Sequence, residues 1–415
     1  MSMKKTNVLS LILLGTVILL ASFFSIKDPT LYVDETVHYK VIENFCNLNF
    51  TIHPNLTNIP AYHAILGGIC YLGSFILPLN SIHFTRITSL FLSLLGLIFF
   101  YLLAKKIQHK TPLFTVLQLF LLPIAFPFYF LVYTDIPAIA PIALALLLTL
   151  NYKYAWAGIL VTLSIAFRQN NFVWLGWLAL TIFFDGMLFK SNLKYLFQYM
   201  LQYLSKVSTF ILGAVAFVGF VKWNGGISLA KAEEWAHPSF SFHLGNVYLM
   251  LVLFTLAFLP IVIATIPKIK RIWNHKLILS LFLLTCGLIT YTFLFQFNNT
   301  HPYNQHEFAV HNKILVLMTQ SFASRLVSLI PMLLALLTIF STKFRRPLYY
   351  LMYPFALLFV LPSWLIEPRY YIIPFYFYLL FKEESSNLTK LSLIIWELIG
   401  SSLLLYGTLN KLLLP

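Results

Sequence analysis

Residues 155–184 read AWAGILVTLSIAFRQNNFVWLGWLALTIFF, and this stretch decides which class of fold the chain has. A membrane-spanning helix needs about 20 apolar residues, so the stretch is long enough for two spans. Its strongly polar run, Arg168–Asn171, stands near the middle. Polar and charged groups at membrane depth are functional candidates by default. The same run also fits an external turn between two spans, and the residues leave both interpretations open.

The composition places the whole chain among membrane proteins. Hydrophobic residues make up 60% of the 415 positions, charged residues make up 10%, and the mean hydropathy is +0.82. A soluble domain carries about 25% charged residues, so lipid must be the solvent for much of the surface. The net charge of +15 comes from short basic clusters between apolar runs. Such clusters are typical of cytoplasmic anchoring, and we expect no nucleic-acid partner.

Apolar segments of about spanning length recur from end to end and predict an all-α, polytopic transmembrane bundle of roughly 12–13 spans. The first follows a basic N-terminus without a convincing cleavage site, so we interpret it as an uncleaved span. We expect one membrane domain over residues 1–415, with a first loop and interfacial helix over 27–86 and the remaining bundle over 87–415. The segments are 8–26, 61–79, 87–104, 113–133, 136–150, 155–184, 206–222, 246–266, 277–297, 316–340, 348–366, 368–381 and 391–411.

Basic clusters indicate which ends of the spans face the cytoplasm. They cannot all lie on one side if every apolar segment crosses. The lysines near residue 105 return to the cytoplasmic side if 61–79, which holds three glycines, does not cross and is a re-entrant or interfacial helix on the far side. The alternative is that 61–79 crosses and the lysines near residue 105 are external. The clusters are Lys4–Lys5, Lys105–Lys106 with Lys110, Lys153, Lys190 with Lys194, PKIKR at 267–271, KFRR at 343–346, and Lys382.

This orientation leaves several polar stretches on the non-cytoplasmic side, where most acids and histidines collect. Asn49, Asn55 and Asn298 lie there in sequences that fit N-glycosylation acceptors, which suits the lumen of the endoplasmic reticulum. The stretches are 27–60, Thr134–Asp135, 223–245, 298–315 and 366–371.

Asp34 and Glu35 are adjacent in LYVDETVHYK, residues 31–40, about eight residues past the first span. Acids in the first turn of a helix stabilise its dipole, so a helix N-terminus explains them without catalysis. Neighbouring residues on a helix point about 100° apart, and the two would therefore not share a proton. One could face a cleft while the other makes a structural contact.

The residues give little support for a metal site. Glu35 and His38 have the i, i+3 spacing of di-metal bundles, but no second Glu-x-x-His is present. HEFAVH at 306–311 separates its histidines by five positions, about 140° apart on a helix instead of on one face. The three cysteines, Cys46, Cys70 and Cys286, lack metal-ligand spacing and allow at most one disulfide.

Arg369, in LIEPRYYIIPF, begins an external helix. Arginine suits forked contacts with phosphate, whereas an ion pair with Glu367 or an interfacial position is the alternative. His301 lies in the loop at 298–315 together with His306, Glu307 and His311. Such histidines could bind anions or sugar hydroxyls, or be solvated.

Taken in order, several stretches resemble the GT-C glycosyltransferases and, among them, the DIE2/ALG10 family, which adds the terminal α-1,2-glucose to a dolichol-linked oligosaccharide. The resemblance runs from residue 31 to about 380, with weaker matches in WNGGISL at 223–229 and HPYN at 301–304. The stretches are YVDETVHYKVIENFC at 32–46, PNLTNIPAYH at 54–63, YTDIPAIA at 133–140, FRQNNFVWLGW at 167–177 and EPRYYIIPF at 367–375.

Two loops depart from the family pattern. The family follows NGGISL with a Gly-Asp-Lys-Ser-x-His run, whereas this chain has AKAEEWAH, in which His237 could correspond to the histidine. After HPY the family shows an Asp-Asn-Arg-His run, and here NQHEFAVH lacks the arginine. These departures bear on acceptor specificity more than on the reaction class.

The resemblance implies a single displacement with inversion, without a metal or other cofactor. It assigns the general base to Asp34, with Glu35 orienting it. Arg369 is the first candidate for the donor phosphate. The other donor-phosphate or substrate-binding candidates are Arg168, Gln169, Asn170, Asp135, His301 and His237.

The partners implied are a dolichyl or polyprenyl phosphate sugar, a lipid-linked oligosaccharide acceptor and membrane lipid, in the endoplasmic reticulum with the active site luminal. An alternative is another GT-C enzyme, which transfers mannose or builds a bacterial envelope polymer at the inner membrane. A transporter is a further alternative, although the sequence shows no half-to-half symmetry of the kind many transporters have.

Overall fold

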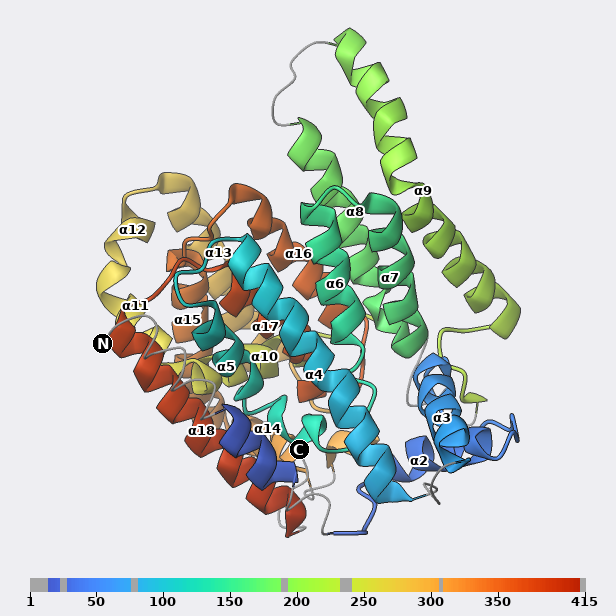
Figure 1. The fold of residues 1–415 in the computed structure, drawn as a ribbon. Helices are drawn as coiled ribbons and strands as arrows, with labels where there is room; N and C mark the ends of the chain where they lie inside the picture. Colours follow the sequence, from blue (N-terminus) through green and yellow to red (C-terminus); the bar gives the residue numbers. More distant parts are fainter. Residues whose placement is uncertain are drawn as a thin grey trace. The chain divides into compact units, whose positions relative to one another are not determined.

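A computed structural model describes residues 14–22, 28–75, 81–187, 193–231, 241–305 and 309–410. Within this part the regular elements are helices, and β structure is confined to bridge residues, such as the isolated bridge between Phe344 and Lys382. The predicted all-α class is confirmed (Figure 1). The longer helices are α2 (Glu35–Cys46), α3 (Ala61–Ser74), α4 (Ile82–Lys106), α5 (Pro112–Phe120), α6 (Ile139–Leu150), α7 (Tyr154–Phe167), α8 (Phe172–Met187), α9 (Leu193–Asn224), α10 (Gly245–Ala257), α11 (Leu259–Thr265), α13 (Lys276–Tyr291), α14 (Val310–Thr319), α15 (Phe322–Ser341), α16 (Met352–Val360), α17 (Ile372–Phe381) and α18 (Asn387–Leu409).

Five helices of the described part are long and apolar enough to cross a membrane: α4, the Met200–Asn224 part of α9, Lys276–Gln296, α15 and α18. α10 and Leu259–Lys268 are apolar enough only when taken together, and they are bent by 85°, as in a broken span or a re-entrant loop. Five or six spans are fewer than the roughly 12–13 predicted, because several apolar segments are divided. The segment 113–133, for example, is helical only to Phe120 before a 3-10 turn at Phe126–Tyr129.

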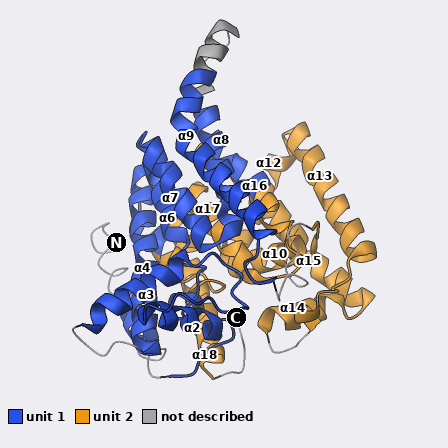
Figure 2. Ribbon diagram, turned by 90° about the vertical axis from the view of Figure 1, so that its right-hand side faces the viewer, with its two compact units in different colours: residues 1–116, 128–235, 348–355 blue, residues 117–127, 236–347, 356–415 orange. Residues whose placement is uncertain are grey.

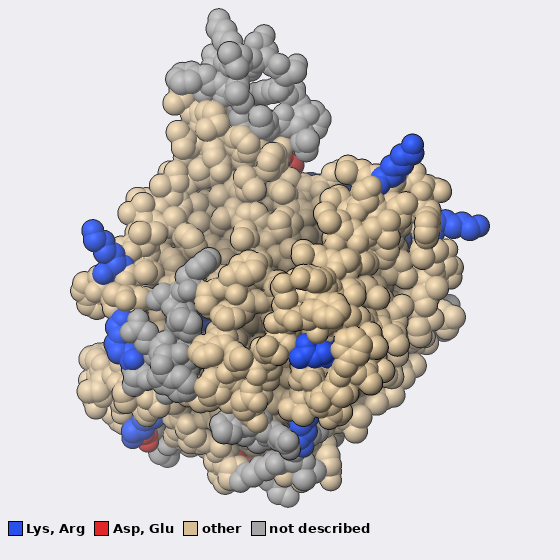
Figure 3. All heavy atoms as spheres, turned by 180° about the vertical axis from the view of Figure 1, so that it is seen from behind, with Lys and Arg blue, Asp and Glu red and all other residues tan. Residues whose placement is uncertain are grey.

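Large apolar side chains on these helices are exposed instead of packed against protein. On α13, Leu277 and Leu284 keep 72% and 70% of their surface accessible. The face drawn in Figure 3 shows the same property, since scattered Lys and Arg side chains are separated by wide uncharged areas. Lipid tails are the solvent that such a surface needs. The chain is therefore a multi-pass membrane protein.

The chain divides into two compact units that alternate along the sequence (Figure 2). Unit 1 comprises residues 1–116, 128–235 and 348–355, and unit 2 comprises residues 117–127, 236–347 and 356–415. A single domain over 1–415 stays a prediction. Of the candidate site residues, Asp34, Glu35, Asp135, Arg168, Gln169 and Asn170 belong to unit 1, and Arg369 and His301 belong to unit 2.

Within unit 1, α7 lies between α6 and α9. Two glycines permit the approach of α7 to α9, since a Cβ on Gly158 or Gly213 would overlap Thr209 or Thr162 of the facing helix. Small residues have this role at helix contacts in membranes, where close backbone approach replaces the hydrophobic effect as the source of association.

Candidate functional site

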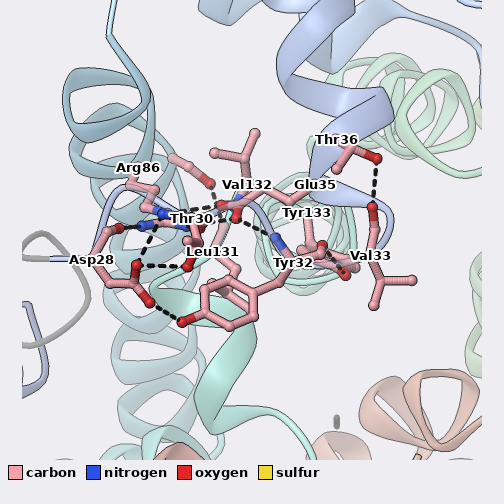
Figure 4. Close-up of polar contacts among 11 residues, drawn as sticks. Asp28, Thr30, Tyr32, Val33, Glu35, Thr36, Arg86, Leu131, Val132 and Tyr133 are labelled. Carbon is pink, nitrogen blue, oxygen red and sulfur yellow. Dashed lines mark hydrogen bonds and ion pairs between the residues drawn. The ribbon is translucent and has the colours of Figure 1, made fainter. Parts of the chain in front are cut away.

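The carboxylate of Glu35 is the centre of a buried network in unit 1 (Figure 4). Its Oε1 accepts hydrogen bonds from Arg86 Nε at 2.9 Å and from the Val132 amide at 2.9 Å. Its Oε2 accepts from Arg86 Nη2 at 2.6 Å and from the Tyr32 amide at 3.1 Å. Four donors match about the four lone-pair sites of a carboxylate. Glu35 is therefore fully engaged, and its side chain is 0% exposed.

Arg86, on α4, ties the same network to the start of the first loop. Its Nη1 donates to the Asp28 carbonyl at 2.5 Å and its Nη2 to the Thr30 carbonyl at 2.6 Å. The guanidinium is 1% exposed. A buried ion pair of this kind needs such additional hydrogen bonds to offset the desolvation of two charges. Arg86 therefore joins α4, the loop and the N-terminus of α2.

Asp34 has a different environment from its neighbour. It is half-buried, stands at the N-cap of α2, and its side chain does not cap that helix. The preceding Val33 has φ 42°, a left-handed conformation that is a genuine outlier for a β-branched residue. Such strain costs about 1–3 kcal/mol and persists only where the surroundings impose it. Here Tyr133 Oη donates to the Tyr32 carbonyl at 3.0 Å, and Thr36 bonds the Val33 carbonyl at 2.7 Å.

Asp28 closes the loop from the other side. It accepts hydrogen bonds from the Thr30 amide at 2.9 Å, from the Thr30 hydroxyl at 2.6 Å and from the Tyr32 hydroxyl. Burial acts to raise the pKa of Asp28, but the hydrogen bonds and the charge of Arg86 outweigh it, and the pKa lies below its ordinary value. Burial, together with the bond to Asp28, raises the pKa of Tyr32 to about 12. At neutral pH the loop thus holds a carboxylate and a neutral phenol.

Helices α2 and α3 form a covalently closed pair. Cys46 and Cys70 form a disulfide, which was not assigned from the sequence. His38 Nδ1 lies 2.9 Å from His63 Nε2, and burial, with the charge of His38 acting the same way, holds the pKa of His63 well below its ordinary value. With 14 residues, α3 is about 21 Å long, too short for a hydrocarbon core of about 30 Å. That 61–79 does not cross stays a prediction, because residues 76–79 lie outside the described part.

The polar run at 168–171 is the break between α7 and α8. Arg168 forms an ion pair with Asp135, so the structure brings these two predicted residues together. Gln169 donates to the carbonyls of Thr57 at 2.9 Å and Ile227 at 3.3 Å, and Asn170 is half-buried. The run therefore connects three non-helical segments of unit 1, which are separated in sequence.

In unit 2, Arg369 forms an ion pair with Glu367, with Nε 3.1 Å from Oε1. From the sequence, this ion pair was the alternative to a contact between Arg369 and phosphate. Asn246 holds the same segment, because its Oδ1 accepts from the Glu367 amide at 3.1 Å and from the Tyr371 hydroxyl at 2.8 Å. Asn304 bonds both the amide and the carbonyl of Ile366 at 2.9 Å.

His301 is buried, and its ring centroid lies 4.6 Å from that of Trp364. His237, His306 and Glu307 lie outside the described residues. Among the described residues, no group of three or more His, Cys, Asp or Glu side chains gathers closely enough to hold a metal ion.

Sequence reasoning missed four buried residues of these networks, namely Arg86, His63, Asn246 and Asn304. For Arg86 a signal existed, because the orientation predicted from the basic clusters puts it at the non-cytoplasmic end of a span, where the positive-inside rule disfavours arginine. Asn246, at the start of α10, and Asn304, in the 3-10 turn Pro302–Gln305, carry no such signal, because they resemble ordinary turn residues.

Comparison with known proteins gives a family match over most of the chain. The model of the DIE2/ALG10 family matches residues 28–380. A protein of Candida albicans named Dol-P-Glc:Glc(2)Man(9)GlcNAc(2)-PP-Dol alpha-1,2-glucosyltransferase is 28% identical, over 86% of this chain and 86% of its own length. One of the same name from Arabidopsis thaliana is 26% identical over 90% and 89%, and one from Rattus norvegicus is 27% identical over 39% and 37%. No solved structure matches the chain.

Proposed function

The chain belongs to the DIE2/ALG10 family, and from this membership we propose that it is an α-1,2-glucosyltransferase of the endoplasmic reticulum membrane. The donor is dolichyl phosphate glucose, and the acceptor is the Glc(2)Man(9)GlcNAc(2) oligosaccharide on dolichyl pyrophosphate, as in the names of the relatives. The observation that carries the proposal is the match over 28–380, which includes every described candidate residue. The names of the relatives support this interpretation over a transporter or another sugar.

Asp34 acts as the general base. The acceptor hydroxyl attacks the anomeric carbon of the donor glucose, Asp34 takes the hydroxyl proton, and the bond from that carbon to the phosphate oxygen breaks. Dolichyl phosphate leaves with the bonding electrons, and a β-linked donor gives an α-linked product by inversion. A positioned base contributes about 10²–10⁴-fold to the rate.

The environments of the two acids support this division of roles. Glu35 accepts four hydrogen bonds from Tyr32, Arg86 and Val132 and has no exposed surface, so it has no capacity for a substrate proton. Asp34 keeps part of its surface accessible, and the fixed turn before it sets its direction. Glu35 therefore acts as the positioning residue that the resemblance implies.

Phosphate binding is assigned to Arg369 first and Arg168 second. Arg369 lies within the 3-10 turn Pro368–Tyr371 before α17, and Arg168 directly precedes the 3-10 turn Gln169–Asn171 before α8. Each forms an ion pair with a carboxylate, Glu367 or Asp135. A guanidinium has five N–H donors in a fixed fork, so a phosphate and a carboxylate can share it. Gln169, Asn170, His301 and His237 remain substrate-binding candidates. Arginine and backbone donors suffice for one phosphodiester, and we propose a metal-independent reaction.

The active site is proposed to face the lumen. The disulfide between Cys46 and Cys70 supports this side, because disulfides persist in oxidising compartments such as the endoplasmic reticulum lumen and are rare in the cytosol. It closes the pair of helices that begins at Asp34.

A transfer assay in membranes tests the proposal. Dolichyl phosphate glucose or dolichyl phosphate mannose is supplied with the lipid-linked acceptor, and the product is analysed by mass. We expect one hexose to be added from the glucose donor alone. Asp34→Asn should lower transfer at least about 10²-fold, while Asp185→Asn, at an exposed position on α8, should leave it unchanged. Near-normal transfer by Asp34→Asn would reject the base, and transfer of mannose would reject the donor.

A further inference from the structure

A pocket of about 300 Å³ lies within unit 2, at the start of α10 and beside the loop that follows α13. Its size is at the lower end of the roughly 300–1,000 Å³ typical of small-molecule sites, so it suits one or two rings of a sugar. Among the described residues that line it, none is Lys, Arg, Asp or Glu. A phosphate or pyrophosphate would find no countercharge in this lining.

Three ring side chains line one part of the pocket. The Trp364 indole meets His301 edge to face, with ring centroids 4.6 Å apart and an interplanar angle of 67°, and it stacks loosely with His243 at 6.1 Å and 24°. Trp364 Nε1 donates to the Thr300 hydroxyl at 3.3 Å, which fixes the indole. Burial lowers the pKa of His243, so its ring is neutral at neutral pH. Aromatic faces of this kind pack against the C–H faces of sugar rings.

The amide side chains of Gln296, Asn298 and Asn299 supply polar groups to the pocket lining. Asn299 donates to the Asn304 carbonyl at 3.1 Å, yet its buried Oδ1 accepts no hydrogen bond from any described residue. A π-helical turn at Thr292–Gln296 ends α13, and its freed carbonyls at Phe293 and Leu294 bond Arg325 at 2.9 and 3.2 Å. This turn places Gln296 in the pocket lining.

We propose that this pocket binds a hexose ring of the acceptor glycan, with the ring against Trp364 and its hydroxyls bound by the amide side chains of Gln296 and Asn299. An uncharged, half-aromatic lining with amide groups fits a neutral polyol, whereas a lipid tail would leave the amides without partners. The donor glucose has the same chemistry, but it carries a phosphate for which the lining offers no cation. The inference rests on the proposed function, because that function supplies the glycan.

Steady-state transfer by purified protein tests the assignment, with acceptor and donor varied separately. Trp364→Ala should raise the KM for the acceptor about tenfold, equivalent to about 1.4 kcal/mol, and Trp364→Phe should give a smaller rise. Asn299→Ala, which also removes the hydrogen bond to the Asn304 carbonyl, should raise the KM for the acceptor as well. The KM for dolichyl phosphate glucose should stay within twofold. Trp273→Ala is the matched control, since Trp273 is 62% exposed and outside the pocket.

A binding measurement separates this inference from the proposed function. Free Glc(2)Man(9)GlcNAc(2) glycan, without lipid, is added to the protein, and saturation-transfer NMR records which sugar protons it contacts. A signal lost in Trp364→Ala but kept in Trp273→Ala supports the pocket even if no transfer occurs. The inference is overturned if transfer proceeds while both Trp364 variants keep the wild-type KM for the acceptor, if the donor KM rises instead, or if mass mapping finds a covalent glycan on Asn298 filling the pocket.

Discussion

Replacing Arg86 by Met is the most demanding test of the buried network, because it leaves the Glu35 carboxylate without a countercharge. The change removes four hydrogen bonds, two to Glu35 and two to the carbonyls of Asp28 and Thr30. Both charged side chains are essentially unexposed, at 1% and 0%. Water therefore cannot replace the lost donors unless the loop opens.

The size of the effect follows from that burial. Breaking a buried ion pair by removing one partner destabilises a protein by about 3–5 kcal/mol. For a folding unit of 150–250 residues, each kcal/mol lowers the Tm by roughly 2–4 °C, so we expect a fall of roughly 6–20 °C. The double variant Glu35→Gln with Arg86→Met removes the stranded charge, and it should recover about 1–3 kcal/mol relative to Arg86→Met alone.

Thermal unfolding in detergent, followed by intrinsic fluorescence, measures these shifts. The control is Lys40→Met, which breaks an exposed ion pair between Lys40 and Glu43 on α2, the helix that carries Glu35. This change should lower the free energy of unfolding by no more than about 1 kcal/mol. The reasoning is refuted if Arg86→Met shifts the Tm no more than Lys40→Met. It is equally refuted if the double variant is less stable than Arg86→Met, because the two groups would then act independently.

Three further predictions concern α3 and the reaction. Gly67→Ala should destabilise the protein by about 1–3 kcal/mol, because a Cβ there lies 2.5 Å from Phe45 Cβ, whereas Gly68→Ala, with nothing within 4 Å, should be neutral or stabilising in the same unfolding assay. Because the pKa of His63 is lowered in the fold, the unfolded chain binds the extra proton below about pH 6.5. Stability should therefore fall as the pH drops below that value, by at most about 1.4 kcal/mol per pH unit, and a Tm series from pH 7.5 to 5.5 should be flatter for His63→Gln. Incubation with EDTA should leave glucose transfer unchanged, and loss that a divalent ion restores would contradict the metal-independent mechanism.

The sequence predicted those features whose cause is local. Four polar residues cannot be placed in lipid without partners, so a division of 155–184 near Arg168 was expected, and α7 ends at Phe167 while α8 begins at Phe172. The bend of 85° between α10 and α11 was not expected, because 246–266 was predicted as one continuous span. No polar residue marks it, and Pro260 stands where a helix can begin as easily as it can break.

The candidate site was predicted only in part, for the same reason. Asp34 and Glu35 attract attention because acids are rare in this chain, and FRQNN does so because it interrupts an apolar run. Their partners depend on tertiary structure: Arg86 meets Glu35 across 51 positions, and Asp135 meets Arg168 across 33. No periodicity relates such distant pairs, so the sequence identified charged residues but could not predict which of them form ion pairs with each other.

Stability alone gives no reason for the network to retain two buried charges, since an apolar pair of similar volume is often as stable. What an apolar pair cannot do is hold the Tyr32 and Val132 amides in fixed directions, as the Glu35 oxygens do at 3.1 and 2.9 Å. Those anchors flank the strained turn at Val33, whose left-handed φ would otherwise relax. Relaxation would rotate Asp34, the next residue. The Glu35–Arg86 ion pair is thus best explained by the orientation that it gives to Asp34. The two adjacent acids have separate roles because Glu35 is immobilised.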